Sequence, residues 1–390
     1  MIGETAHMTS SVLPEYGVRS LAEVLPALLG ALGVPPAPGT ATRGPTILPV
    51  RAAGLLLVDG LGGELLRAHA ADAPFLASLP DAGPLTVGFP SSTSISLASL
   101  GTGLPPGAHG LVGISFRTGG TLLDTLKWTV HGKKDADLRE LLPPERVQPA
   151  PTELERAEAA GVEVSVVSSR AFRGSGLTRA ALRGGRFRGV YALGDLAAEV
   201  IGALTGPGRR LCYGYHADLD ALGHAHGPGS LPWRLQLAQI DRLAALIVEH
   251  LPPDDVLAIS GDHGMVRVGQ VFDADTDEAL ELGVDLLGGD PRARHVYARP
   301  GAAGEVLAAW REVLGDAAWV MPREQAVAEG WFGPVGELAA DRIGDIVAAA
   351  RGTAAIVRSV AEPALSRLPG QHGSLSVEEQ LVPLLLARSG

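Results

Sequence analysis

The sequence predicts an α/β fold with a mostly parallel central sheet and helices on both faces. Short, largely apolar runs recur along the 390 residues, at 54–58, 162–167, 211–215 and 256–260, and each gives way to polar or glycine-containing turns. Helical patterns lie between them, the longest at 232–251. Strands without polar alternation are buried on both faces, and strands that alternate with helices are typical of a parallel sheet. With 46% hydrophobic residues, the chain is long enough to bury such a sheet.

Acidic residues follow the predicted strands. The first strand ends at Asp59, the third runs toward Asp218 and Asp220, and the fourth ends at Gly261 and Asp262. In open parallel sheets, ligands bind beyond the carboxyl ends of the strands. We therefore expect the functional site at this edge of the sheet.

The chain is predicted to form a single domain over residues 1–390, with a small α+β insert at about 274–340. An acidic loop there leads to a strand-like "RHVYARP", a helical "AGEVLAAWREVLG" and then "AWVMP". This pattern differs from the buried strands before it, so we expect a smaller unit attached to the main sheet.

Composition excludes several classes of partner. The net charge is −11 and no Lys/Arg-rich run occurs, which argues against a nucleic-acid backbone. Cys212 is the single cysteine, so no intrachain disulfide is possible. The apolar stretch 20–34 contains Glu23 and Pro26 and is too short to span a bilayer. No signal-peptide pattern is present in the sequence given, so we expect a cytoplasmic protein with no membrane partner.

Two pairs of residues have the spacing of metal ligands. Asp220 and His224 lie four residues apart, so on a helix both side chains reach a single ion. Asp262 and His263 are adjacent and flanked by glycines, and a tight turn would let both converge. Each residue alone has an ordinary explanation, as a turn former, a helix cap or a surface histidine.

Asp59 and His372, the latter in a glycine-flanked loop, complete a set of three aspartates and three histidines. Such mixed N/O ligands suit two divalent cations and favour zinc, with manganese as the alternative. Two such ions outweigh three carboxylates, so an acidic protein could still hold a phosphate. A hydroxyl beside one ion would become a nucleophile at neutral pH.

A hydroxyl-rich stretch, "FPSSTSISLASLGTGL" at 89–104, could supply that nucleophile. Serine and threonine also cap helices, so the stretch has a purely structural interpretation as well. The residues alone do not choose among Thr93, Ser91 and Ser92.

The order of these motifs resembles one protein family. Asp59 after the first strand is followed by "P-x-x-T", "S-L-x-T-G-L-x-P-x-x-H-G", "D-x-x-G-H", "D-H-G-M" and a late "H-G". This order resembles the nucleotide pyrophosphatase/phosphodiesterase branch of the alkaline phosphatase superfamily, and it spans residues 59 to 372. The resemblance implies an alkaline phosphatase-like fold and a phosphoric ester hydrolase.

The resemblance also implies roles for single residues. Thr93 would attack phosphorus and form a covalent phospho-threonine. The implied metal ligands are Asp59, Thr93, Asp262 and His263 for one ion, and Asp220, His224 and His372 for the other. The implied substrate is a small phosphate ester, with a nucleotide as one candidate.

Two departures from the family bear on the substrate. Family members often carry an asparagine three residues after the nucleophile, where this chain has Ser96, so Ser96 is the candidate substrate-binding residue that would donate a hydrogen bond to a phosphoryl oxygen. Monoesterase relatives carry an arginine soon after the nucleophile, whereas the next arginine here is Arg117. A phosphodiester or nucleotide pyrophosphate is therefore favoured. The alternatives are a phosphomonoesterase on the same scaffold, or a metal-dependent phosphotransferase or phosphate-binding protein.

Overall fold

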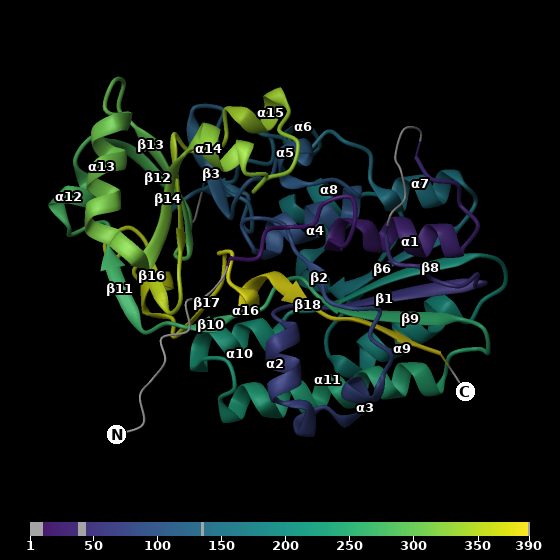
Figure 1. The fold of residues 1–390 in the computed structure, drawn as a ribbon. Coiled ribbons are helices and arrows are strands. Elements are labelled where there is room, and N and C mark those ends of the chain that lie inside the picture. Colours follow the sequence, from purple (N-terminus) through teal and green to yellow (C-terminus); the bar gives the residue numbers. More distant parts are fainter. Residues whose placement is uncertain (1–10, 38–43, 134–135, 389–390) are drawn as a thin grey trace, which may run out of the picture.

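The computed structural model describes residues 11–37, 44–133 and 136–388 and contains a central six-stranded sheet (Figure 1). Five strands run parallel, and β19 joins one edge antiparallel to β9. In sheet order the strands are β19 (Leu384–Ala387), β9 (Val256–Gly261), β1 (Ala52–Val58), β8 (Arg210–His216), β6 (Glu163–Ser169) and β7 (Arg186–Val190). This architecture confirms the predicted fold class.

Both faces of the sheet are covered, which explains why the central strand β1 is apolar throughout. In β1, Leu55 and Leu57 point into one hydrophobic core, whereas Leu56 and Val58 point into a second core on the opposite face. The first core is packed by α1 (Val24–Ala31), α4 (Thr93–Thr102), α7 (Glu153–Ala159) and α8 (Gly176–Ala181). The second is packed by α2 (Gly63–Ala68), α3 (Pro74–Ser78), α9 (Leu193–Leu204) and α11 (Leu231–Glu249).

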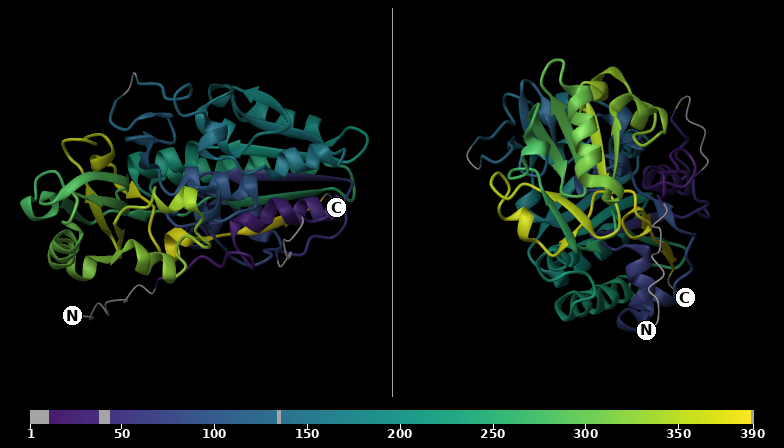
Figure 2. Two further views of the ribbon diagram at one scale, coloured as in Figure 1. Left: turned by 90° about the horizontal axis from the view of Figure 1, so that it is seen from above. Right: turned by 60° about the vertical axis from the view of Figure 1, so that its left-hand side comes forward.

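An α+β unit lies at one end of the molecule, beyond the carboxyl ends of the parallel strands (Figures 1 and 2). Its antiparallel sheet has the order β12 (Val284–Asp290), β13 (Ala293–Ala298), β15 (Ile346–Ala350) and β14 (Ala318–Pro322). Helix α13 (Ala303–Leu314) packs on this sheet through Val306 and Trp310 in a third core. Because β15 is an inner strand, the unit continues past residue 340, the end that the sequence predicts.

Smaller elements surround these two sheets. The hairpin region has β3 (Ser115–Thr118), β4 (Thr121–Asp124) and β5 (Thr129–Val130), and the other short strands are β2 (Leu85–Thr86), β10 (Val266–Arg267), β11 (Gln270–Asp273), β16 (Ala354–Val357), β17 (Gly370–Gln371) and β18 (Leu381–Val382). The remaining α-helices are α5 (Pro106–His109), α6 (Pro144–Val147), α10 (Asp218–His226), α12 (Glu278–Glu281), α14 (Arg323–Ala328), α15 (Glu337–Ala340) and α16 (Val377–Gln380). Short 3-10 helices are η1 (Leu21–Glu23), η2 (Ala70–Asp72), η3 (Arg170–Phe172), η4 (Gly315–Ala317) and η5 (Leu365–Arg367).

Among the residues described, no helix combines the length and apolar character needed to cross a bilayer.

Candidate active site

The predicted metal ligands converge at the carboxyl edge of the central sheet. Asp59 follows β1 and Asp262 follows β9, and these strands pair directly, with Val58 opposite Gly261. On the other side of β1 lies β8, which leads into α10 and its ligand pair. His372 reaches the same place from the loop after β17. The parallel topology therefore brings ligands from four distant parts of the chain together.

The first cluster contains Asp59, Asp262 and His263. Their candidate ligand atoms all lie within 4.8 Å of one another. The His263 Nε2 atom is 3.4 Å from Asp59 Oδ1 and 3.5 Å from Asp262 Oδ2. All three side chains are buried, so a cation bound among them would be shielded from water.

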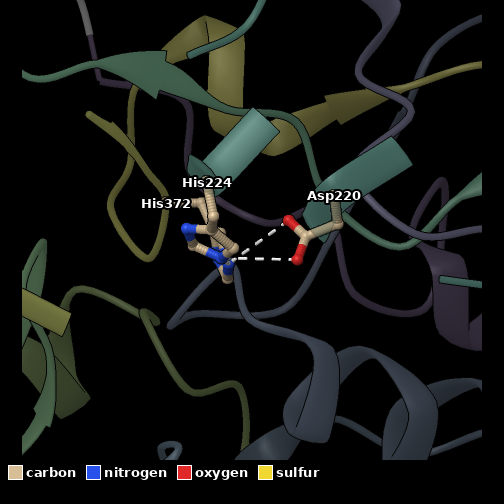
Figure 3. A group of neighbouring side chains, drawn as sticks. All are labelled: Asp220, His224 and His372. Atoms are coloured by element: carbon tan, nitrogen blue, oxygen red, sulfur yellow. Dashed lines mark hydrogen bonds and ion pairs between the residues drawn. The ribbon is translucent and has the colours of Figure 1, made fainter. Parts of the chain in front are cut away.

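The second cluster contains Asp220, His224 and His372, whose side chains point toward one another (Figure 3). His224 Nε2 lies 3.3 Å from Asp220 Oδ2 and 3.2 Å from His372 Nε2. The ring of His372 also stacks on His263, with 3.6 Å between centroids. The two clusters are therefore neighbours, as a two-metal centre requires.

The electrostatics of both clusters fit a bound cation. Asp262 Oδ2 and Asp220 Oδ1 are buried without a hydrogen-bond partner. Burial raises the pKa of Asp262 to about 6, and it raises the pKa of Asp59 and of Asp220 well above the ordinary value. Burial also lowers the pKa of His263 to about 4, so its imidazole is neutral and free to bind metal. A divalent cation in each cluster would supply the missing positive charge and the missing partners.

Backbone contacts orient all three imidazoles in the same way. Each Nδ1 lies 2.8–3.0 Å from a carbonyl oxygen, His224 from Gly370, His263 from Gly264 and His372 from Ser91. When Nδ1 carries the proton and donates a hydrogen bond to the carbonyl oxygen, Nε2 keeps a free lone pair. Such contacts typically fix the ring orientation of a metal-binding histidine.

Thr93 is the first residue of α4 and faces the first cluster. Its Oγ1 atom lies 3.2 Å from His263 Nε2 and 3.4 Å from Asp59 Oδ1. The other hydroxyls of residues 91–96 are committed elsewhere: Ser91 donates to Ser374 O, Ser92 to Asp290 Oδ1, Ser94 to Gly113 O and Ser96 to Asp262 O. Among these hydroxyls, that of Thr93 therefore contacts the candidate ligand side chains of the first cluster.

Ser96 differs from the expectation that it contacts substrate. Its side chain is fully buried one turn into α4, and its Oγ donates to the backbone carbonyl of Asp262 over 2.5 Å. A serine side chain is too short to make this bond and also reach the open side of the cluster. The observed contact instead holds the Asp262 loop against the helix that begins at Thr93.

Tyr215 is a site residue that sequence reasoning missed. It lies near the end of β8, and its hydroxyl donates a short hydrogen bond to Asp59 Oδ2. This bond orients one oxygen of Asp59 and leaves Oδ1 toward His263 and Thr93. The position of Tyr215 at the end of an apolar strand, beside the predicted site, was the available signal.

Glu379 and Arg292 form a buried ion pair next to the loops that carry His263 and His372. Sequence reasoning also missed this pair. The Arg292 Nε and Nη2 atoms donate to Glu379 over 2.9 and 2.6 Å, and both side chains are fully buried. Glu379 accepts from the backbone N–H of Ser374, and its own carbonyl accepts from Gly264 N–H. Because these bonds reach the loops that follow His372 and His263, the pair ties the two ligand loops together.

The fold and these clusters describe an α/β protein with a candidate two-metal site. Residues 55–375 match the family model described as type I phosphodiesterase / nucleotide pyrophosphatase. The chain belongs to this family and is an enzyme of the phosphodiesterase/nucleotide pyrophosphatase type, as its motif order indicates.

Among curated proteins, the chain is similar to the catalytic subunit of GPI ethanolamine phosphate transferase 3 from Homo sapiens and from Mus musculus. The identities are 36% and 35% over 75 residues, which is 19% of this chain. The match spans 7% of the length of each relative, so it covers only a small part of those proteins.

Solved structures share the fold over most of the chain. Murine ectonucleotide pyrophosphatase/phosphodiesterase 5 aligns with a TM-score of 0.66 and 17% identity, covering 87% of this chain and 88% of its own. For the human protein the TM-score is 0.67 and the identity 18%, with coverages of 86% and 87%. Phosphonoacetate hydrolase from Sinorhizobium meliloti aligns with a TM-score of 0.63 and 21% identity, covering 87% of this chain and 91% of its own. At these identities the likeness supports the fold.

Proposed function

We propose that this enzyme hydrolyses phosphodiester or nucleotide pyrophosphate bonds through a covalent phospho-threonine at Thr93. The observation that carries the proposal is the Thr93 hydroxyl, 3.2 Å from His263 Nε2 and 3.4 Å from Asp59 Oδ1. A nucleophile beside metal ligands is the arrangement that activates a hydroxyl at neutral pH.

Two divalent cations, zinc or alternatively manganese, fit the donor sets and the unpartnered carboxylate oxygens. One would be held by Asp59, Thr93, Asp262 and His263, and the other by Asp220, His224 and His372. When bound, such cations lower the pKa of a nearby hydroxyl and offset the charge of the phosphate.

The side chains of this chain then have distinct tasks. Thr93 Oγ1 loses its proton and forms a bond to phosphorus. The P–O bond to one ester group breaks, and that group takes up a proton and leaves as an alcohol. Water cleaves the phospho-threonine and restores the hydroxyl. Tyr215 fixes the Asp59 side chain, and Ser96 fixes the Asp262 loop. The groups around the nucleophile are therefore already ordered before the reaction begins.

The charge of the site favours diesters over monoesters. Within the described part of the chain, neither lysine nor arginine forms an ion pair with Asp59, Asp220 or Asp262. A monoester dianion brings one more negative charge than a diester, and among the described residues no lysine or arginine is paired with these three aspartates to balance it.

A nucleotide is the first substrate to test. An inactive variant of murine ectonucleotide pyrophosphatase/phosphodiesterase 5 was solved with AMP, and this supports a nucleotide arm in the present chain. We keep a cytoplasmic location as part of the proposal, resting on the single, buried Cys212.

Turnover of bis(p-nitrophenyl) phosphate and p-nitrophenyl phosphate by the metal-loaded enzyme tests the proposal. We expect faster diester cleavage and a loss of roughly 10³-fold or more in Thr93→Ala, with partial activity in Thr93→Ser. Thr102→Ala is a matched control, because Thr102 lies in the same helix and donates to Ala98 O.

Full diester turnover by metal-loaded Thr93→Ala would remove Thr93 from its proposed role. Faster monoester cleavage would make the enzyme a phosphomonoesterase. A phosphorylated Thr93 that is not hydrolysed would indicate a phosphotransferase.

A further inference from the structure

A cavity lies where the turn between β3 and β4, the start of α14 and the segment from α15 to β15 come together (Figure 1). Its volume is about 510 Å³, and sites for small molecules typically measure roughly 300–1,000 Å³. Neither Thr93 nor any of the six candidate metal ligands lines it. The proposed function therefore makes no use of this cavity.

Two guanidinium groups in the cavity wall lack a countercharge. Arg342 is only 4% exposed, and its Nη1 atom donates to the carbonyl oxygens of Gly110 and Val147 over 2.7 and 2.8 Å. The guanidinium of Arg117 lies over the ring of Tyr297, 4.6 Å from its centroid. Within the described part of the chain, neither arginine forms an ion pair with a carboxylate. A buried cation in this state is stabilised by any anion that reaches it.

Tyr297 fixes the positions of these two arginines. Its hydroxyl accepts a hydrogen bond from Arg117 N–H over 2.9 Å and donates one to the carbonyl oxygen of Arg342 over 2.5 Å. The third arginine of the wall, Arg323, is already neutralised, because its Nη2 atom lies 2.6 Å from Asp345 Oδ1. The cavity therefore holds two ordered positive charges that are available to a ligand.

Two carboxylates balance these charges from the outer part of the cavity. Glu337 and Asp341 line it, and both are exposed. Among the residues that the structure describes, neither is paired with a lysine, an arginine or a histidine. A ligand with only negative charge would be repelled by these carboxylates, and one with only positive charge by the guanidinium groups. A ligand that carries one charge of each sign complements both.

We propose that this cavity binds a small dipolar molecule, an amine-bearing carboxylate. Its carboxylate lies at Arg117 and Arg342, because the planar guanidinium fork matches the two oxygens of a carboxylate. Its ammonium group faces Glu337 and Asp341 nearer to solvent, and Leu338 offers apolar surface to the carbon chain between the two charges. The inference is independent of the proposed function, since the two sites share no residue.

The test compares three probes with the same five-carbon chain: δ-aminovalerate, valerate and pentylammonium. The first carries both charges, and each of the others carries one. Binding of each probe to the metal-loaded protein is measured by isothermal titration calorimetry. We expect δ-aminovalerate to bind about tenfold more tightly than either of the others, the ratio that one charge-assisted hydrogen bond provides.

Substitutions at the two ends of the cavity should remove the preference in different ways. In Arg117→Ala, the affinity for δ-aminovalerate should fall about tenfold, whereas Arg117→Lys should keep part of it because the positive charge remains. In Asp341→Asn, δ-aminovalerate should bind no better than valerate. Neither side chain is buried, so both variants should fold.

Arg242→Ala is the matched control, because Arg242 pairs with Glu249 at the surface and does not line the cavity. This variant should keep the tenfold preference. Equal binding of the three probes, tighter binding of valerate, or failure of δ-aminovalerate to bind would overturn the inference. A preference that survives both Arg117→Ala and Asp341→Asn would overturn it as well, by placing the ligand elsewhere on the protein.

Discussion

Replacing Glu379 by glutamine would leave the guanidinium of Arg292 buried without a countercharge. The two side chains are fully buried and joined by two hydrogen bonds, and Glu379 also accepts from Ser374 N–H and Ser376 Oγ–H. Removing one member of a buried ion pair costs about 3–5 kcal/mol, because the remaining charge stays desolvated. Unfolding entropy of about 2.1 cal/mol/K per residue over 390 residues converts this to a fall in Tm of roughly 4–6 °C.

Thermal unfolding of Glu379→Gln, followed by circular dichroism with and without zinc, measures this effect. Because Glu379 links the loops that follow His263 and His372, zinc affinity should also fall, by about 10- to 100-fold. Glu249→Gln is the control, since Glu249 pairs with Arg242 at the surface and such pairs contribute at most about 1 kcal/mol. If the two variants melted at the same temperature, the structural role assigned to the buried pair would be wrong.

Three further outcomes are expected. Chelation should lower Tm, and zinc at about 100 times its Kd should restore roughly 2.7 kcal/mol; an unchanged melt would argue against metal binding. Burial opposes ionisation of Glu362, but Arg294 and His131 outweigh it and lower its pKa to about 2. The stability that Glu362 contributes is therefore complete above its unfolded pKa of about 4.5 and is lost as pH falls toward 2, so the Tm advantage over Glu362→Gln should shrink between pH 6 and 3; a constant difference would contradict this. Ser96→Ala should cost about 1 kcal/mol of unfolding free energy without changing KM for the diester. A tenfold rise in KM at unchanged stability would instead show that Ser96 contacts the substrate.

The two candidate ligand clusters could be predicted because the positions of their residues follow from topology. A carboxylate at the end of a largely apolar strand, as at Asp59 or Asp262, lies at the carboxyl edge of a parallel sheet whatever the details of packing. The four-residue spacing of Asp220 and His224 likewise needs only a helical turn. Both features can be recognised from a few consecutive residues of the chain.

The contacts between distant residues could not be predicted in this way. Ser96 is directed at Asp262 O because of the rotation of α4 about its axis, which no local pattern encodes. Glu379 has the sequence surroundings of a surface helix, yet Arg292 of the α+β unit buries it. The extent of that unit was underestimated because β15, "IVAAA", is apolar and carries no sign of which sheet it joins.

The most direct measurement of the central claim is the covalent state of the enzyme during turnover. Zinc-loaded protein mixed with bis(p-nitrophenyl) phosphate is quenched in acid and analysed by tandem mass spectrometry, and its metal content is determined in parallel. We predict two zinc ions per chain, as a two-metal centre requires, and a nitrophenyl phosphoryl group on Thr93. An adduct on Ser91 or Ser92, or sustained turnover without bound metal, would contradict the role assigned to the cluster around Thr93.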